Sequence, residues 1–286
     1  RPNVGKSTLM NHLLGEKVAI VSPKPQTTRN RIAGILTKGE DQYVFLDTPG
    51  VHHAKNKLGE FMMKTVRSSV GSADAVILIA EAGYPAGEIE KNLINQIKKS
   101  ELPSILVLNK IDLANREKLA ETIANYAALH DFDAVVPTCA ETGKNVSDVL
   151  DEAEKFLYEG EWMFDEDSLT DQPERQIAAE IIREKLLRTL SDEIPHGTAV
   201  VIEQFDEDDK MIRIRAEIYC EKQSHKGIIV GKNGETLKKI GTYAREDMEA
   251  FFGTKVYLNL WVKVKEKWRD DQLSLNSFGF KPEQNM

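Results

Sequence analysis

The chain has 286 residues, of which 41% are hydrophobic and 29% charged, as is usual for a soluble globular protein with room for two domains. No run approaches the roughly 18 apolar residues of a membrane span and no secretory signal is visible, so we expect no integral membrane protein. Its two cysteines, Cys139 and Cys220, give neither a disulfide framework nor a metal-ligand spacing, which favours a reducing cytoplasm.

Net charge is −8, which by itself disfavours nucleic acid as a partner. The charge is uneven, because residues 210–239 hold 8 basic and 3 acidic side chains. A basic stripe in an acidic chain predicts a nucleic-acid face, although chance clustering on a solvated surface explains the charge alone equally well.

The chain opens on the second half of a phosphate-binding loop, whose pattern is Gly, four residues, then Gly-Lys-Ser/Thr. The first glycine would precede Arg1, so we expect the chain as given to begin inside the motif, without the strand that feeds it. Backbone N–H groups wrap a phosphate there, Lys6 reaches the β- and γ-phosphates, and Ser7 holds Mg²⁺. A Gly-Lys-Ser turn without function is the alternative. The predicted nucleotide ligands are Asn3, Val4, Gly5, Lys6, Ser7 and Thr8, and a helix follows up to Gly15.

Residues 22–29 contain two prolines and four hydroxyl residues, which predicts a loop. A loop threonine at this distance from a phosphate loop places its hydroxyl on Mg²⁺ and its backbone on the γ-phosphate in nucleotide switches. We predict that Thr28 has this role, with Thr27 as the alternative.

Two strands, 32–37 and 42–46, are predicted around a polar turn, and the second runs into Asp47-Thr48-Pro49-Gly50. Asp47 is predicted to hold Mg²⁺ through water, and the Gly50 N–H to contact the γ-phosphate. Val51 follows where many switch GTPases have a water-orienting glutamine, and valine cannot take that role. His52 and His53 are weak candidates for it.

Apolar runs at 75–80 and 104–108 predict strands buried on both faces, with a helix at 89–97 between them. The second strand ends in Asn109-Lys110-Ile111-Asp112. Asp112 is predicted to accept from guanine N1 and the 2-amino group, Asn109 to tether the loop and Lys110 to pack over the base.

A helix at 117–129, a strand at 134–137 and a helix at 146–157 complete the first domain. The loop between this strand and the last helix is predicted to make a second guanine contact. Cys139 stands there in place of the usual serine, and we expect the Ala140 N–H to donate to guanine O6. Strands alternating with helices predict an α/β domain with a doubly wound, mostly parallel sheet and the site at the strands' carboxyl ends.

The rest of the chain predicts a second domain, 176–286, after a GTPase domain at 1–160 and an acidic linker at 161–175. Its elements run helix, strand, strand, helix, helix, strand, the type II order of an α+β KH domain. A Gly-x-x-Gly loop lies inside the basic stripe, and such a loop clamps single-stranded RNA in KH domains, although alone it is usually a turn. The predicted RNA-binding residues are Lys226, Ile228, Ile229, Val230, Gly231, Lys232, Asn233, Gly234 and Lys238. The segment 263–269, which contains Trp268, is predicted as a basic tail with an aromatic.

Together, the motifs at 1–7, 25–29, 47–50 and 109–112, the Gly-x-x-Gly domain and the segment 260–265 closely resemble the bacterial Era GTPases over essentially the whole chain. The resemblance implies hydrolysis of GTP to GDP with Mg²⁺, and binding of the 3′ end of small-subunit ribosomal RNA during assembly of the 30S particle. It also implies a cytoplasmic monomer with loose contact to the inner face of the cell membrane.

In this family a hydrophobic residue replaces the catalytic glutamine, as Val51 does here. In related GTPases the loop asparagine, here Asn3, coordinates a K⁺ ion that replaces an arginine finger. The catalytic roles implied by the resemblance fall on Lys6, Thr28, Gly50 and Asn3. Two other hypotheses stay open: an RNA chaperone that nucleotide only gates, and a GTPase whose second domain binds protein or membrane partners.

Overall fold

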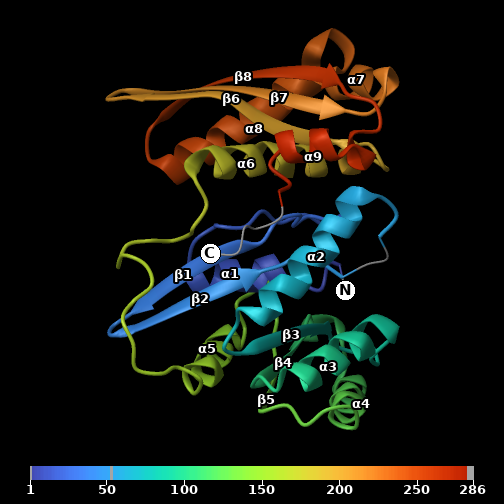
Figure 1. Cartoon of the computed structure of the whole chain (residues 1–286), viewed down its shortest axis with the longest axis vertical. Coiled ribbons are helices and arrows are strands. Elements are labelled where there is room, and N and C mark those ends of the chain that lie inside the picture. The colour runs from blue at the N-terminus through green and yellow to red at the C-terminus, as the bar shows by residue number, and fades with distance from the viewer. Residues whose placement is uncertain (1, 52–53, 282–286) are drawn as a thin grey trace. The chain divides into compact units, whose positions relative to one another are not determined.

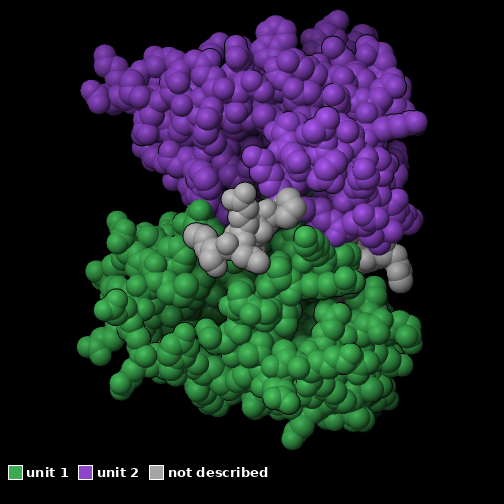
Figure 2. Space-filling model, viewed as in Figure 1, with its two compact units in different colours: residues 1–19, 28–53, 62–171 green, residues 20–27, 54–61, 172–286 purple. Residues whose placement is uncertain are grey.

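The computed structural model describes residues 2–51 and 54–281 (Figure 1). The chain divides into two compact units, coloured separately in Figure 2. The first consists of residues 1–19, 28–53 and 62–171, and the second of residues 20–27, 54–61 and 172–286.

A parallel sheet of three strands forms the centre of the first unit, in the order β3 (Val76–Glu81), β4 (Ser104–Asn109) and β5 (Ala134–Pro137). All six residues of β4 are buried, as its continuous apolar run predicts. Leu106 and Leu108 join one core cluster, whereas Ile105 and Val107 join another.

Helices cover both faces of this sheet, which confirms the doubly wound α/β architecture. One face packs against Ile94 and Ile97 of α3 and Tyr126 of α4, and the other against Leu9 of α1 and Val149 of α5. The bounds of these helices are Lys6–Leu14 for α1, Glu88–Ser100 for α3, Arg116–Ala127 for α4 and Val146–Glu154 for α5.

An antiparallel hairpin of β1 (Ile32–Lys38) and β2 (Asp41–Asp47) forms a separate two-stranded sheet. It packs on α1 through a cluster that includes Met10, Leu14 and Ile32. The end of β2 therefore lies near the start of α1, where the predicted phosphate loop is.

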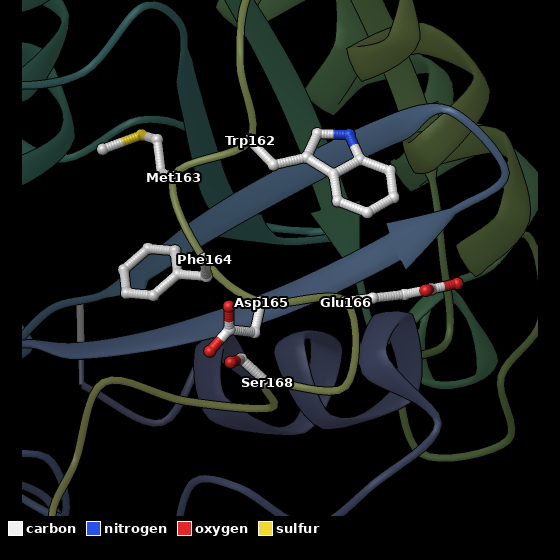
Figure 3. Close-up of a pocket in the computed structure, with 6 residues that line it drawn as sticks. All are labelled: Trp162, Met163, Phe164, Asp165, Glu166 and Ser168. Atoms are coloured by element: carbon white, nitrogen blue, oxygen red, sulfur yellow. The ribbon is translucent and has the colours of Figure 1, made fainter.

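The acidic segment after residue 160, predicted as a linker, packs along this hairpin (Figure 3). The backbone N–H groups of Met163 and Phe164 donate to Gln42 Oε1 at 2.9 and 3.0 Å, and Leu169 O accepts from Ile35 N at 2.9 Å. The first unit accordingly extends to Asp171. A shallow pocket here is lined by Trp162, Met163, Phe164, Asp165, Glu166 and Ser168, none of them a predicted site residue.

The second unit has the predicted KH order. Its sheet is mixed, because β6 pairs antiparallel and β8 parallel with the central β7. Ile212, Ile214, Ala216 and Ile218 of β7 are all at most 1% exposed and pack against the helices. The elements are α6 (Glu174–Thr189), β6 (Ala199–Asp208), β7 (Met211–Cys220), α7 (Gln223–Val230), α8 (Glu235–Phe252) and β8 (Lys255–Val264).

Two helices were not predicted, α2 (Lys57–Gly71) and α9 (Gln272–Ser277). The sequence predicts a helix over residues 235–240 after the Gly-x-x-Gly loop, and α8 continues twelve residues beyond that, to Phe252. The prediction that Trp268 belongs to a basic tail is wrong. Its side chain is fully buried, and its Nε1 donates to Gly197 O at 2.9 Å. Short 3₁₀ helices span Ile111–Leu113, Pro195–Gly197, Lys232–Gly234 and Trp268–Asp270. Within the described ranges, no helix combines the length and apolarity needed to cross a bilayer.

Candidate nucleotide site and nucleic-acid groove

The phosphate loop ends where α1 begins. Gly5 precedes the helix with φ 96° and ψ 26°, and no side chain caps the helix start. Free N–H groups at a helix N-terminus bind phosphate, since they add to the positive end of the helix dipole. A Cβ on Gly5 would come within 2.2 Å of Asn109 Nδ2, so the fold requires glycine at this position.

The three predicted metal ligands lie together. Ser7 Oγ donates to Asp47 Oδ2 at 2.6 Å, Thr28 Oγ1 donates to the same oxygen at 3.0 Å, and the two hydroxyl oxygens are 3.1 Å apart. They come from the start of α1, the loop before β1 and the end of β2.

This cluster has the chemistry that Mg²⁺ requires. Asp47 is 5% exposed, and its second oxygen, Oδ1, is buried without a hydrogen-bond partner. Burial raises the pKa of this carboxyl, and the charge of Lys6 opposes the increase. A buried carboxylate with a spare oxygen beside two hydroxyls is suited to a hard cation that keeps part of its water. In the described part of the chain no three His, Cys, Asp or Glu residues could hold a metal together, so this site depends on its hydroxyls.

Lys6 and Gly50 lie side by side. A Cβ built on Gly50 would be 3.5 Å from Lys6 Nζ and 3.1 Å from the Cα of Pro2. Burial lowers the pKa of Lys6, and the nearby Asp47 carboxylate opposes this. The motif at the end of β2 thus reaches the lysine that is predicted to contact the β- and γ-phosphates.

Asn109 connects the phosphate loop to the guanine-reading loops. Its Nδ2 donates to Val4 O at 2.7 Å, and its Oδ1 accepts from Ala140 N at 2.8 Å and Thr138 Oγ1 at 3.2 Å. The side chain is 3% exposed, so all three bonds are shielded from water. The predicted tethering role thereby acquires specific partners.

The base-reading residues lie around this tether. Lys110 has φ 62° and forms an ion pair with Glu81 at 3.1 Å, while Asp112 is exposed in the following 3₁₀ helix. Cys139 and Ala140 are 3% and 1% exposed. Asp112 is thus an accessible carboxylate in the loop that follows Asn109, where a base can reach it.

The structure also describes most of the other residues considered for the nucleotide site. Asn3 is exposed with φ 61°, and Val51 is half-buried. The Thr27 hydroxyl donates to Lys24 O at 2.7 Å, whereas Thr28 joins the metal cluster, so the geometry favours Thr28 of the two. His52 and His53 lie outside the described residues.

In the second unit, the Gly-x-x-Gly loop joins α7 to α8. Gly231 has φ 75° and ψ 175°, and Asn233 and Gly234 are left-handed at φ 53° and 80°. A Cβ on Gly231 would lie 2.2 Å from Thr236 Oγ1 and 2.9 Å from the Thr236 backbone nitrogen. Lys232 and Asn233 project from the loop and are exposed, as contact with a phosphate backbone requires.

One predicted groove residue is wrong: Ile229 is fully buried in the core of the second unit, so its side chain is inaccessible to a base. It faces inward because α7 turns its side chains every 100°, which places Ile228 outside at 50% exposure. Val230 is half-buried, Lys226 half-exposed and Lys238 exposed. Tyr243 of α8, which is not among the predicted residues, is 47% exposed with Lys239 Nζ 5.8 Å from its ring centre.

Comparison with known proteins agrees with both predicted domain types. Residues 1–110 match the family of 50S ribosome-binding GTPases, and residues 193–269 match the KH domain family. The GTPase Era of Ruminiclostridium cellulolyticum is 48% identical over 286 residues, which are 100% of this chain and 96% of that protein. The GTPase Era of Clostridium botulinum strain Hall is 49% identical over 282 residues, 98% of this chain and 95% of that protein.

Solved structures agree with these relatives. The crystal structure of Era in complex with MgGDPNP and nucleotides 1506–1542 of 16S ribosomal RNA has a TM-score of 0.94 and 38% identity, covering 98% of this chain and 96% of that one. A variant of Aquifex aeolicus Era bound to GDP·AlF4⁻ gives the same values. Since relatives that are 48–49% identical cover at least 98% of this chain and 95–96% of their own length, this chain belongs to the Era family of GTPases.

Proposed function

We propose that the chain is a GTP-hydrolysing switch that binds GTP and GDP with Mg²⁺ in its first unit and the 3′ end of small-subunit ribosomal RNA in its second. Its role is to assist assembly of the 30S particle in the cytoplasm. The observation that carries the proposal is the convergence of Ser7, Thr28 and Asp47 beside the N-terminus of α1.

The residues divide the work of phosphoryl transfer. Lys6 and the N–H groups at the start of α1 hold the phosphates, and the Gly50 N–H holds the γ-phosphate in line with an attacking water. Ser7, Thr28 and Asp47 would hold Mg²⁺, which supplies positive charge to the β- and γ-phosphate oxygens when bound. Thr28 contributes only while γ-phosphate is present, so its loop reports the state of the nucleotide.

A test of the metal site is Asp47→Asn, which keeps the shape of the side chain and removes its charge. We expect GTP hydrolysis to fall by about a hundredfold or more, because the proposed Mg²⁺ site loses the negative charge of its carboxylate. The measurement is phosphate release at varied Mg²⁺ concentration. Asp133→Asn is the matched control, since that carboxylate accepts a backbone N–H from Ser104 at 2.7 Å in the same unit. Equal hydrolysis by the parent and Asp47→Asn would contradict the proposed site.

Activation by K⁺ is a separate expectation, which rests on Asn3. We expect hydrolysis in potassium chloride to exceed hydrolysis in sodium chloride by about tenfold, because K⁺ would add positive charge near the transferring phosphoryl group. Asn3→Gly should make the two salts equivalent without straining the backbone, since glycine accepts the φ of 61°. Equal turnover of the parent protein in both salts would remove this role.

RNA is the partner proposed for the second unit because the Era of the solved complex binds nucleotides 1506–1542 of 16S ribosomal RNA. The exposed Lys232 and Asn233, carried on a loop whose glycines allow close approach, support the proposal. A second unit that binds a protein or membrane partner instead is the alternative, and loss of RNA binding on changing this loop would exclude it. A monomeric state and peripheral membrane contact stay predictions.

A further inference from the structure

Helix α6 carries three consecutive charged residues that are almost completely buried. Arg183, Glu184 and Lys185 are 2%, 0% and 7% exposed. A buried charge without a partner lowers the stability of the fold, so the partners of these three side chains identify the segments that α6 binds. Lys185 pairs with Glu184 at 3.0 Å and with Asp247 of α8, which ties α6 to the KH core.

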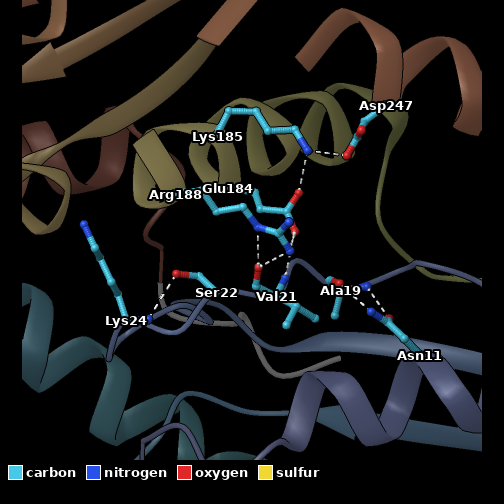
Figure 4. A network of polar contacts seen from close by, with 9 residues as sticks. All are labelled: Asn11, Ala19, Val21, Ser22, Lys24, Glu184, Lys185, Arg188 and Asp247. Carbon is cyan, nitrogen blue, oxygen red and sulfur yellow. Dashed lines mark hydrogen bonds and ion pairs between the residues drawn. The ribbon is translucent and has the colours of Figure 1, made fainter. Parts of the chain in front are cut away.

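Helix α6 also contacts residues 20–27, the segment directly before Thr28, which belongs to the same compact unit. Figure 4 shows the contacts that Glu184 and Arg188 make with Val21. Glu184 Oε1 accepts from the Val21 N–H at 3.1 Å. Arg188 Nε and Nη2 donate to Val21 O at 3.1 and 2.9 Å, and Arg188 is 3.2 Å from Glu184. Both backbone polar groups of Val21 are therefore bound by α6.

The other end of the segment is bound too. Arg183 Nη2 donates to the Thr27 carbonyl, while Arg183 Nε donates to Glu180 at 2.9 Å, which orients the guanidinium. Lys24 Nζ also donates to Leu190 O at the end of the helix. The segment is thus held to α6 near its beginning, its middle and its end.

Both chain neighbours of this segment belong to the nucleotide unit. Before it, Ala19 exchanges two hydrogen bonds with the Asn11 side chain of α1, at 2.7 and 2.9 Å. After it, Thr28 places its hydroxyl 3.0 Å from Asp47. Because a peptide unit is planar, fixing the Thr27 carbonyl also fixes the direction in which the chain continues to Thr28.

We propose that Arg183 is a positioning residue for GTP hydrolysis: through the Thr27 carbonyl it holds Thr28 where the hydroxyl reaches the metal cluster, with Glu184 and Arg188 fixing the start of the same segment. The inference rests on the proposed function, since Thr28 must be a ligand of nucleotide-bound Mg²⁺. Helix α6 also carries Ile182 and Leu186 in the KH core. Any displacement of α6 that RNA causes therefore changes GTP affinity, and by linkage GTP changes RNA affinity.

The test is Arg183→Met in the full-length protein, with affinities for GDP and for a non-hydrolysable GTP analogue measured in Mg²⁺ by competition with a fluorescent nucleotide. Thr28 acts only with γ-phosphate, so we expect about a tenfold loss for the analogue, a matching loss of hydrolysis, and GDP affinity unchanged within about twofold. Arg175→Met is the control, because Arg175 also lies on α6 and donates to a backbone carbonyl, Glu203 O, at 3.3 Å. Equal losses for both nucleotides, or none, would overturn the inference.

A double-mutant cycle with Thr28→Ala separates this inference from the function on which it rests. If Arg183 acts through Thr28, the analogue affinity of the double variant equals that of Thr28→Ala alone. Additive losses contradict the inference. A Thr28→Ala variant that keeps full analogue affinity contradicts the metal-site assignment, and the inference with it. Should Arg183→Met not fold, Arg188→Met replaces it, because Arg188 is half-exposed. We expect a smaller loss of affinity for the analogue and none for GDP. An unchanged analogue affinity in Arg188→Met would contradict the proposal.

Discussion

Asp112→Asn is expected to lower the affinity for GTP by about a hundredfold or more and to allow binding of xanthosine triphosphate. The carboxylate accepts two hydrogen bonds from guanine, whereas an asparagine can still accept from N1–H but places its N–H₂ donor against the 2-amino donor of the base. Xanthine has a carbonyl where guanine has its amino group, so it can accept from that N–H₂. Asp112 is exposed beside the Asn109 tether, so the change leaves the buried hydrogen bonds intact.

Competition titrations with GTP, ATP and xanthosine triphosphate measure this effect directly. The control is Asp131→Asn, which removes another exposed carboxylate of the first unit without touching the tether. An unaltered base preference in Asp112→Asn would show that another residue reads guanine.

Lys232→Asp combined with Asn233→Asp is expected to lower RNA affinity by about a hundredfold or more and to leave GTP hydrolysis without RNA unchanged. The pair places two negative charges where a phosphate backbone passes, and phosphate contacts supply much of the affinity. Both glycines are retained, because a side chain on Gly231 would collide with Thr236. A loss of RNA binding could then come from a distorted loop rather than from the changed charge. Aspartate tolerates the left-handed conformation of Asn233, with φ 53°.

Binding is measured at fixed salt with a fluorescent single-stranded oligonucleotide that copies the 3′ end of 16S ribosomal RNA. The control is Lys210→Asp, which reverses a charge within the same basic stripe but at the β6–β7 turn. Unchanged RNA affinity in the double variant would exclude the Gly-x-x-Gly loop as the RNA clamp and favour a protein or membrane partner for the second unit.

Local signals were enough to predict residues that the structure brings together around the start of α1. Each of them has fixed neighbours in a motif at an element end: Ser7 lies in the first turn of α1, Asp47 ends β2 and Asn109 ends β4. The choice of Thr28 over Thr27 depended on which hydroxyl faces Asp47, which the structure supplies. Ile229 was misplaced because apolar residues that line a groove and those that fill a core look alike in a short run.

Two features were not predicted, for different reasons. Helix α2 has a local signal, since Leu58, Met62 and Val66 repeat with helical spacing, but it is weak. The buried Arg183 and Glu184 had none, since an Arg-Glu-Lys run on a helix usually indicates a solvated face. Their partners, Val21 and Thr27, lie more than 150 residues away in the chain, and no spacing rule connects them.

The affinity of the full-length protein for the 16S 3′-end oligonucleotide, compared between GDP and a non-hydrolysable GTP analogue at fixed salt, tests the switch most directly. Because the segment before Thr28 is bound by the first helix of the KH unit, we expect tighter RNA binding with the analogue. Equal, sequence-specific binding in both nucleotide states would contradict this expectation and would show that the two units bind their ligands independently.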